Sequence, residues 1–354
     1  MPIRKLARSL RARFGDHLRP IWVRSTAAVK VSEFLRRPMK NSWLPFAGGK
    51  LGSALRRWAQ RHADLLHPWR HVTKAAGDSR AAGFLRRAVS RKLYDYLART
   101  YPLAEWTTMN YGYAILPGDT PCLAVDPSVP EHLALQLYMR VAVALQSDDC
   151  LKLNRCEVLE IGSGRGGGAA YLARHFRPRR YVALDMSVEA TALARRQHGE
   201  ESAVEFVGGD AENLPFAKAS FDVVINVESA HCYGSIDRFL AEVHRVLRSG
   251  GRLAFADFVS ERHGARARLL ATLRQTPLRL VHLEEITANV VAALAQDEVR
   301  KRTLLNRWVK GWFRSFAQGA YAMEGSAMQR ELAARRTVYL VAVLEKAPAA
   351  TATR

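Results

Sequence analysis

The chain is poor in cysteine and has no long apolar run. Its 354 residues include four cysteines, at positions 122, 150, 156 and 232, and no CxxC pair occurs among them. Neither a disulfide framework nor a zinc site is therefore expected. No stretch approaches the roughly 18 uninterrupted apolar residues that span a membrane, and arginines interrupt the first 24 residues, where a secretory signal needs an apolar block. We expect a cytoplasmic protein that is not exported.

Acidic residues are scarce at the beginning of the chain. Residues 1–94 hold 22 lysines and arginines against four acidic residues, whereas the whole chain holds 54 against 33. Prolines and glycines break up the short apolar groups there, which predicts a basic extension that is partly helical or disordered. Such an extension suits an acidic partner or a membrane surface better than it suits a nucleic acid. A solvated arm without any ligand explains the same charge.

From about residue 152, short apolar runs alternate with helical patterns, which predicts an α/β fold with a parallel sheet and crossover helices. The clearest helix, Ser235–Leu247, has apolar residues at helical spacing and is followed by two glycines that would end it. Five segments rich in β-branched and aromatic residues are expected to be strands: Cys156–Ile161, Tyr181–Asp185, Val204–Val207, Phe221–Asn226 and Arg252–Asp257.

A glycine-rich segment, VLEIGSGRGGG at 158–168, follows the first predicted strand and precedes a helix. Glycines at such a turn let the backbone approach a ligand closely. Gly162, Gly164 and Gly167 also satisfy the dinucleotide-binding template, and Asp185 ends the next strand, where it would accept hydrogen bonds from a ribose. A nicotinamide enzyme is therefore a competing interpretation, and a tight turn without a ligand is another.

Glu160 favours a different cofactor. It stands two residues before the first glycine of the segment. A carboxylate at this place would attract the ammonium group of an amino-acid-bearing cofactor and would repel a pyrophosphate.

A second polar element, GDAENLPF at 209–216, follows the third predicted strand. Asp210 could accept a hydrogen bond from an adenine amino group, with the Ala211 amide beside it, or it could cap its own turn. Together with SFDVV at 220–224 and RVLRSGG at 245–251, this element forms an ordered series that resembles the class I S-adenosylmethionine-dependent methyltransferases.

The resemblance can be narrowed within that class. The stretch 209–251, which contains NVESAHCY at 226–233, is similar to the phthiotriolone and phenolphthiotriolone dimycocerosate O-methyltransferases, which act on long, lipid-like polyketides. The likeness spans about residues 131–346, and MNYGY at 109–113 resembles a segment that lies over the cofactor in related natural-product enzymes. It implies a Rossmann-like, seven-stranded, mostly parallel sheet, S-adenosyl-L-methionine as cofactor and a hydrophobic small molecule as acceptor.

Three regions follow from these patterns. We predict the basic extension at 1–94, a helical cap at 95–151 and the Rossmann-like methyltransferase domain at 152–348. Within that domain, 261–302 is predicted to be an amphipathic helical lid whose leucines are available to line an apolar pocket. Ordinary helix packing explains the same leucines.

His231 and Asp257 are the candidate catalytic pair. His231 follows the fourth predicted strand and Asp257 ends the fifth, so both are expected at the carboxyl edge of a doubly wound sheet, where ligands bind. In natural-product sugar O-methyltransferases that resemble this chain, a histidine and an aspartate at matching motif positions form the catalytic pair, which implies a base and its orienting acid here. Alternatively, His231 is a loop histidine bonded to backbone and Asp257 a helix cap. Cys232 is expected to be a small apolar filler.

The remaining candidates contact cofactor or substrate. No HExxH motif or carboxylate cluster occurs, so we predict a metal-independent enzyme. The residues predicted to bind the cofactor are Glu160, Gly162, Ser163, Gly164, Gly166, Asp185, Met186, Asp210, Ala211, Glu212, Asn226 and Tyr138. The residues predicted to contact the substrate are Tyr111, Tyr113 and Glu228.

The leading functional hypothesis is O-methylation of a hydroxyl on a hydrophobic polyketide, lipid or glycosylated secondary metabolite. The reaction is an in-line displacement that requires alignment of its partners, with His231 removing the hydroxyl proton. One alternative is C-methylation of a quinone, sterol or similar ring. Another is a cofactor-binding protein without catalysis that binds nucleic acid through its basic arm.

Overall fold

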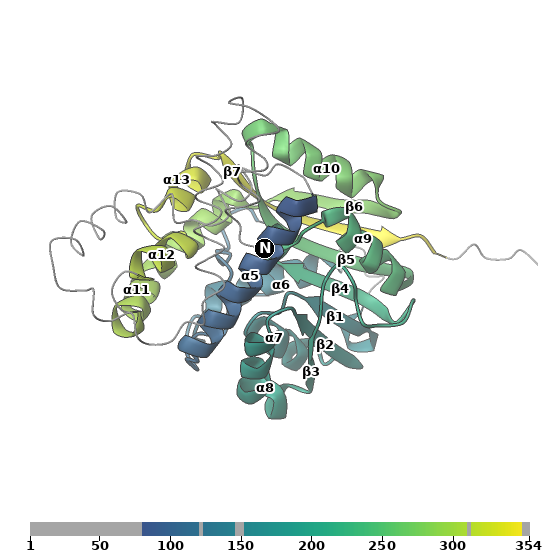
Figure 1. Ribbon diagram of the computed structural model, residues 1–354, viewed down its shortest axis with the longest axis horizontal. Helices are drawn as coiled ribbons and strands as arrows, with labels where there is room; N and C mark the ends of the chain where they lie inside the picture. The colour runs from purple at the N-terminus through teal and green to yellow at the C-terminus, as the bar shows by residue number, and fades with distance from the viewer. Residues whose placement is uncertain (1–79, 120–122, 146–151, 310–312, 349–354) are drawn as a thin grey trace, which may run out of the picture. The chain divides into compact units, whose positions relative to one another are not determined.

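The structure is a computed structural model that describes residues 80–119, 123–145, 152–309 and 313–348 (Figure 1). All described residues belong to one compact unit, His62–Arg354. Most of the predicted basic extension, residues 1–79, lies outside the described residues.

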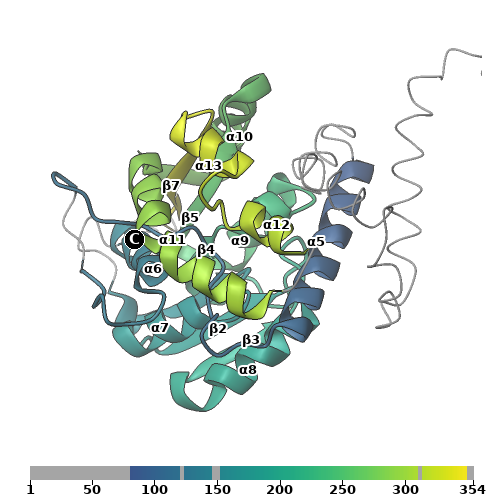
Figure 2. The same cartoon turned by 90° about the vertical axis from the view of Figure 1, so that its left-hand side faces the viewer.

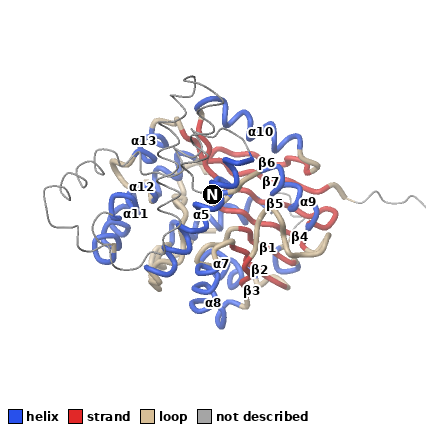
Figure 3. Tube along the Cα trace, in the orientation of Figure 1, coloured by secondary structure: helices blue, strands red, loops and turns tan. Residues whose placement is uncertain are grey.

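A seven-stranded sheet with the order β3-β2-β1-β4-β5-β7-β6 runs through the described unit (Figure 3). Its first five members in that order are parallel to one another, and β7 is antiparallel to both β5 and β6. The strands are β1 (Glu157–Ile161), β2 (Arg180–Asp185), β3 (Val204–Gly208), β4 (Phe221–Val227), β5 (Leu247–Ser260), β6 (Leu278–Glu285) and β7 (Thr337–Lys346). The predicted Rossmann-like, mostly parallel sheet is confirmed.

Helices cover both faces of the sheet because its strands are apolar on both sides (Figure 2). Val158 of β1 belongs to an apolar cluster shared with α6 and α7, whereas its neighbour Leu159 belongs to a cluster shared with α9 and α10. The α-helices are α5 (Arg80–Thr100), α6 (His132–Leu145), α7 (Gly167–Phe176), α8 (Val188–Ser202), α9 (Ile236–Val246), α10 (Ala265–Gln275), α11 (Thr287–Trp308), α12 (Phe313–Ala320) and α13 (Ala327–Ala333). Short 3₁₀ helices are η4 (Leu153–Arg155), η5 (Ala230–Cys232) and η6 (Arg262–Gly264).

Helix α5 contains the end of the predicted basic extension. It is one continuous helix from Arg80 to Thr100, and Ala98 packs with Ala190 and Leu193 of α8. The boundary that we expect after residue 94 therefore falls inside a helix. Within the cap expected at 95–151, the described residues include the end of α5 and the whole of α6, while residues 120–122 and 146–151 lie outside the described residues.

The lid segment is only partly helical. Helix α10 and most of α11 lie within 261–302, but the helical expectation is wrong for Leu278–Glu285, which form the edge strand β6. Exposure alternates along β6: Arg279, Val281 and Leu283 are exposed, while the residues between them are at least half-buried. An alternation with a period of two indicates a strand. In the structure this strand pairs with β7. Among the described helices, none is long and apolar enough to cross a membrane.

Candidate active site

The glycine-rich turn between β1 and α7 leaves backbone open at one point. Gly162 and Gly164 have φ angles of 78° and 55°, which favour glycine. A Cβ added at Gly162 would lie 2.3 Å from the Ser229 hydroxyl oxygen, whereas one added at Gly164 would meet nothing within 4 Å. Gly162 therefore permits close packing, and Gly164 presents bare backbone on which a ligand can lie. Ser163 bridges the turn, because its carbonyl accepts from the Gly166 amide.

Asp185 at the end of β2 is bonded to this turn. Its carboxylate accepts from the Gly164 amide at 2.8 Å and from the Ser187 amide at 2.8 Å. Burial raises the pKa of Asp185, while the two backbone bonds oppose that rise. The structure thus places the predicted ribose-binding carboxylate directly beside the predicted cofactor loop, with half-buried Met186 next along the chain.

Glu160 is buried beneath the turn, with 1% of its surface exposed. It accepts from the hydroxyls of Tyr181 at 2.7 Å and Tyr138 at 3.1 Å. Burial raises the pKa of Glu160 to about 7, although both tyrosine bonds lower it. Its charge therefore changes near neutral pH, and Glu160 and Tyr138, two predicted cofactor residues, form one bonded group.

Asn226 at the end of β4 organises the neighbouring loop. Its Nδ2 atom donates to the Ile161 carbonyl and to the hydroxyls of Ser229 and Tyr233, over 2.7–2.9 Å. Its Oδ1 atom is buried and has no hydrogen-bond partner within the part of the chain that the structure describes. Because buried polar atoms are normally paired, this oxygen is an acceptor available to a ligand.

Asp210 serves its own turn and also contacts α5. It accepts from the Glu212 amide at 3.0 Å, which is the capping role, and its other oxygen accepts from Arg87 of α5 at 2.8 Å. Its side chain is 41% exposed. Beside it, Ala211 is buried and Glu212 accepts from the Gly234 amide at 2.6 Å.

The sequence motifs missed the contribution of α5 to this edge. Arg86 donates to the Tyr233 carbonyl at 2.8 Å, and Asp95 accepts from the Ser187 hydroxyl at 2.7 Å. At Gly83 an added Cβ would lie 2.3 Å from the Gly234 carbonyl oxygen, so the helix lies directly against that loop. No local motif marks these residues, because their partners are about 90 to 150 positions away in the chain.

His231 and Asp257 lie together, as their neighbouring strands require. The Nδ1 atom of His231 is 3.0 Å from Oδ1 of Asp257, and the His231 amide donates to Oδ2 at 3.0 Å. The Asp257 side chain is 3% exposed and that of His231 19%. Burial alone would lower the pKa of His231, but Cys232 and the Asp257 carboxylate outweigh it and hold this pKa well above its usual range. Cys232 is a free, buried thiol 3.8 Å from the Tyr94 hydroxyl.

Aromatic rings adjoin this pair. The Phe258 ring lies 4.5 Å from that of His231, centroid to centroid, and Tyr111 stacks on Phe258 at 5.5 Å. Glu228 accepts from the Tyr111 amide at 2.9 Å and from the Tyr339 hydroxyl at 3.0 Å. Burial raises the pKa of Glu228 to about 8. Two predicted substrate residues, Tyr111 and Glu228, are therefore bonded beside the catalytic candidates.

Three further residues are Tyr113, which was predicted from the sequence, and Phe258 and Tyr339, which were not. Tyr113 is buried, and its hydroxyl donates to Asp119. Asp119 also accepts from Asn289 of α11, so Tyr113 is linked to Asn289 through this carboxylate. Sequence reasoning did not select Phe258 or Tyr339. Phe258 directly follows Asp257, which was a usable signal, whereas Tyr339 reaches the site only through the antiparallel pairing of β7 with β5.

Comparison with known proteins identifies the family of this chain. Residues 159–255 match the model of a methyltransferase domain. The chain is 36% identical over 263 residues to a phthiotriol/phenolphthiotriol dimycocerosates methyltransferase of Mycobacterium tuberculosis, an alignment that covers 72% of this chain and 93% of the relative. It is 34% identical over 234 residues to a fatty-acid O-methyltransferase of Mycolicibacterium smegmatis, covering 64% of this chain and 79% of that protein.

A solved structure shares the fold. The [4+2]-cyclase SpnF superposes with a TM-score of 0.56 and 20% sequence identity, covering 74% of this chain and 96% of that one. At this identity the likeness concerns the fold alone.

Proposed function

Because this chain belongs to the class I S-adenosylmethionine-dependent methyltransferases, we propose that it methylates a hydroxyl of a hydrophobic, lipid-like acceptor, with His231 as the base. The observation that carries this proposal is the bonded pair of His231 and Asp257 beside the rings of Phe258 and Tyr111. A base held by a buried acid and set against apolar rings suits an uncharged alcohol in an apolar environment.

The residues at the sheet edge fit the cofactor. The bare backbone at Gly164 leaves room for a ligand, and the buried Oδ1 of Asn226 offers it an acceptor. In this proposal Asp185 would hold the ribose hydroxyls, Asp210 and the Ala211 amide the adenine, and Glu160 and Asn226 the ammonium end. When bound, S-adenosylmethionine supplies a methyl group activated by a sulfonium.

The work of the chain itself is to orient the acceptor and to move one proton. With Nδ1 of His231 bonded to Asp257, the proton would transfer to Nε2. The Asp257 carboxylate fixes the orientation of the ring and stabilises the imidazolium that forms, as the acid does in other histidine–aspartate pairs. A positioned base of this kind contributes about 10²- to 10⁴-fold to rate. The rings of Phe258 and Tyr111 limit water near the reacting oxygen.

The names of the relatives support a lipid-like acceptor, although a fatty acid presents a carboxylate and not an alcohol. One acts on phthiotriol dimycocerosates and another on fatty acids. We extend the proposal to the basic region, whose 22 lysines and arginines in residues 1–94 suit an anionic membrane surface or another acidic partner.

Product analysis tests the proposal. The full-length chain would be incubated with S-adenosylmethionine and long-chain alcohols, fatty acids or quinols, and the products analysed by mass spectrometry. We expect an O-methyl ether from an alcohol, a large loss of rate in His231→Gln, and wild-type rate in the control His263→Gln, since His263 is exposed on η6. A C-methylated quinol would instead support the alternative chemistry. Cofactor binding without methylation of any acceptor, together with salt-dependent binding to DNA, would support the non-catalytic alternative.

A further inference from the structure

Arg165 stands in the middle of the glycine-rich turn and has no role in the site described above. It lies between Gly164 and Gly166, yet it is only 1% exposed. Burial lowers the pKa of Arg165, although Tyr321 and Glu131 oppose this change. Every hydrogen bond that its guanidinium donates to a described residue ends on a backbone carbonyl. Burying a cation is costly unless polar groups compensate it, so these carbonyls hold the side chain in place.

The guanidinium of Arg165 caps the end of α5. Its Nη2 atom donates to the carbonyls of Leu97 at 3.1 Å and Tyr101 at 2.8 Å. Leu97 lies in the last turn of α5 and Tyr101 directly follows Thr100, the last residue of the helix. The dipole of a helix attracts positive charge at this end, where arginine side chains bond the final carbonyls. Arg165 therefore closes α5 from 64 to 68 positions away in the chain.

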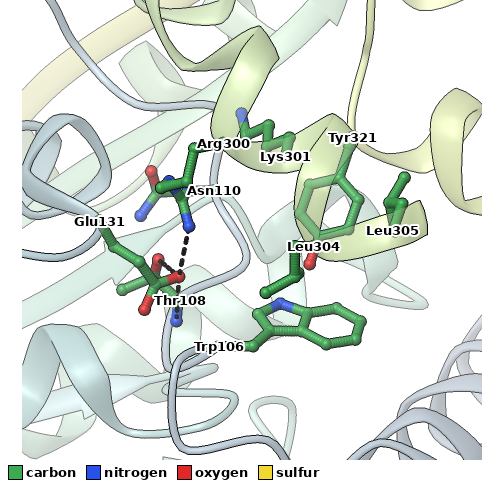
Figure 4. Close-up of a pocket in the computed structure, with 9 residues that line it drawn as sticks. All are labelled: Trp106, Thr108, Asn110, Glu131, Arg300, Lys301, Leu304, Leu305 and Tyr321. Atoms are coloured by element: carbon green, nitrogen blue, oxygen red, sulfur yellow. Dashed lines mark hydrogen bonds and ion pairs between the residues drawn. The ribbon is translucent and has the colours of Figure 1, made fainter. Parts of the chain in front are cut away.

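The same guanidinium holds the segment that follows α5. Its Nη1 atom donates to the Trp106 carbonyl at 3.0 Å, and its Cζ atom lies 4.0 Å from the centroid of the Trp106 ring. Tyr321 packs on this indole with 5.5 Å between the ring centroids, and Figure 4 shows the two rings in the wall of one pocket. Arginine suits this place because its planar fork donates in several directions while its face stacks on an aromatic ring.

A second contact joins the glycine-rich turn to the segment after α5. The Gly167 amide donates to the Thr107 carbonyl at 3.1 Å, and a Cβ added at Gly167 would lie 2.3 Å from the Thr107 hydroxyl oxygen. Thr107 is fixed in turn by Glu131, which accepts from both its amide and its hydroxyl. The open backbone at Gly164 is therefore followed by a side chain and an amide that are both anchored to residues 106 and 107.

Helix α5 also contacts the other two loops of the proposed cofactor site. Asp95 accepts from the hydroxyl of Ser187, which lies two residues after the predicted ribose-binding carboxylate. Arg87 donates to Asp210, the predicted adenine-binding residue. Together with the cap from Arg165, these contacts connect one helix to the loops that follow β1, β2 and β3. The position of α5 and the spacing of the three loops therefore depend on each other.

We propose that Arg165 is a positioning residue for the cofactor: by capping α5, it holds the backbone at Gly164 in the conformation that the cofactor needs. This role rests on the cofactor site of the proposed function. Coupling between two parts of a protein is reciprocal. A cofactor that binds more tightly when α5 is capped must therefore stabilise the end of α5 when it binds.

Calorimetric titration of S-adenosylhomocysteine and hydrogen exchange of the full-length chain test this role. We expect Arg165→Met to weaken the Kd of S-adenosylhomocysteine by about tenfold. Arg165→Lys keeps the charge but loses the fork, so it should weaken the Kd by a smaller factor. In the wild type, S-adenosylhomocysteine should slow amide exchange in the last turn of α5, and this protection should be smaller in Arg165→Met.

Two controls separate positioning from general destabilisation. Arg174→Met removes an exposed arginine from α7 and should leave the Kd unchanged. Leu273→Ala removes most of a buried side chain from α10. It should lower Tm through the cavity that it leaves, without changing the Kd or the protection of α5.

An Arg165→Met variant that binds as tightly as the wild type would overturn the proposal. So would a Kd that Leu273→Ala weakens as much as Arg165→Met does. Should Arg165→Met fail to fold, exchange in the wild type decides the question: protection of the last turn of α5 at saturating S-adenosylhomocysteine supports the role, and unchanged exchange refutes it. A wild type that does not bind S-adenosylhomocysteine would refute the cofactor site itself, and the role of Arg165 with it.

Discussion

The Nδ1 atom of His231 lies 3.0 Å from Oδ1 of Asp257, across 26 positions of sequence. The contact exists because β4 and β5 are paired in parallel. His231 follows the end of β4, and Asp257 directly follows the last residue of β5 that pairs with β4, so both lie at the same edge of the sheet. The same carboxylate also receives the His231 amide at 3.0 Å, so both the ring and the backbone of the histidine are held by one acid.

Asp257→Asn should move the pH profile of methyl transfer. The wild-type pKa of His231 is held well above its usual range, so the neutral base forms only as pH rises beyond neutrality, and kcat/KM should rise with it. Removing the carboxylate lowers that pKa, so the rise should shift to lower pH while the maximal rate falls by about 10²-fold or more. Rates measured from pH 6 to pH 10 test this, with Asp237→Asn, at an exposed position of α9, as the control. A lower rate with an unmoved profile would mean that Asp257 is structural.

Glu228→Gln should change how stability depends on pH. Burial raises the pKa of Glu228 to about 8 from an ordinary value of 4.5. Between these values the folded state holds a proton that the unfolded state has released, so wild-type stability falls as pH rises across this window, by at most about 1.4 kcal/mol per pH unit. Glutamine retains an oxygen to accept from Tyr111 and Tyr339 and does not ionise. Urea unfolding at pH 6 and pH 9 should show a smaller loss for the variant, and equal losses would refute the assignment.

Tyr138→Phe should weaken cofactor binding at neutral pH. Burial raises the pKa of Glu160 to about 7, and the Tyr138 hydroxyl is one of two bonds that lower it. Losing this bond raises the pKa further, so less carboxylate is present at pH 7 to attract a cationic cofactor. Calorimetric titration of S-adenosylmethionine should show an affinity that increases from pH 6 to pH 8.5, with the increase displaced upward in the variant.

Two controls accompany that titration. Tyr171→Phe changes a half-buried tyrosine of α7 that is not bonded to Glu160, and it should behave as the wild type. Glu160→Gln should remove the pH dependence. An affinity that is independent of pH in the wild type would place Glu160 outside the electrostatics of the cofactor site.

Gly168→Ala should destabilise the fold, whereas Gly199→Ala should not. A Cβ at Gly168 would lie 2.0 Å from the Tyr138 ring, but one at Gly199 of α8 would meet nothing within 4 Å. Overpacking of this kind costs about 1–3 kcal/mol, and alanine in an open helical position gains about 1 kcal/mol over glycine. Thermal unfolding of both variants measures the contrast. Equal Tm values would show that Tyr138 can move aside without cost.

Much of the fold was predictable from the sequence, because the signals are local. The five parallel strands are near-continuous apolar runs, and their predicted positions agree with the structure to within a few residues, except that β5 begins earlier, at Leu247. The edge strand β6 was missed. Its alternation is weak beside the apolar residues of α10 and α11, and its pairing partner β7 lies some 60 residues later.

The sequence by itself determined the family, the Rossmann-like sheet and the contiguous motifs, and the methyltransferase class prevailed over a nicotinamide enzyme. These features depend on residues that are adjacent in the chain or on a fixed order of strands. Only the tertiary structure decided that Arg87 binds Asp210, that Tyr339 binds Glu228, and that Trp106, Lys301 and Tyr321 share a pocket. Those contacts join segments about 20 to 200 residues apart, and no local propensity or spacing encodes which distant side chains pack together.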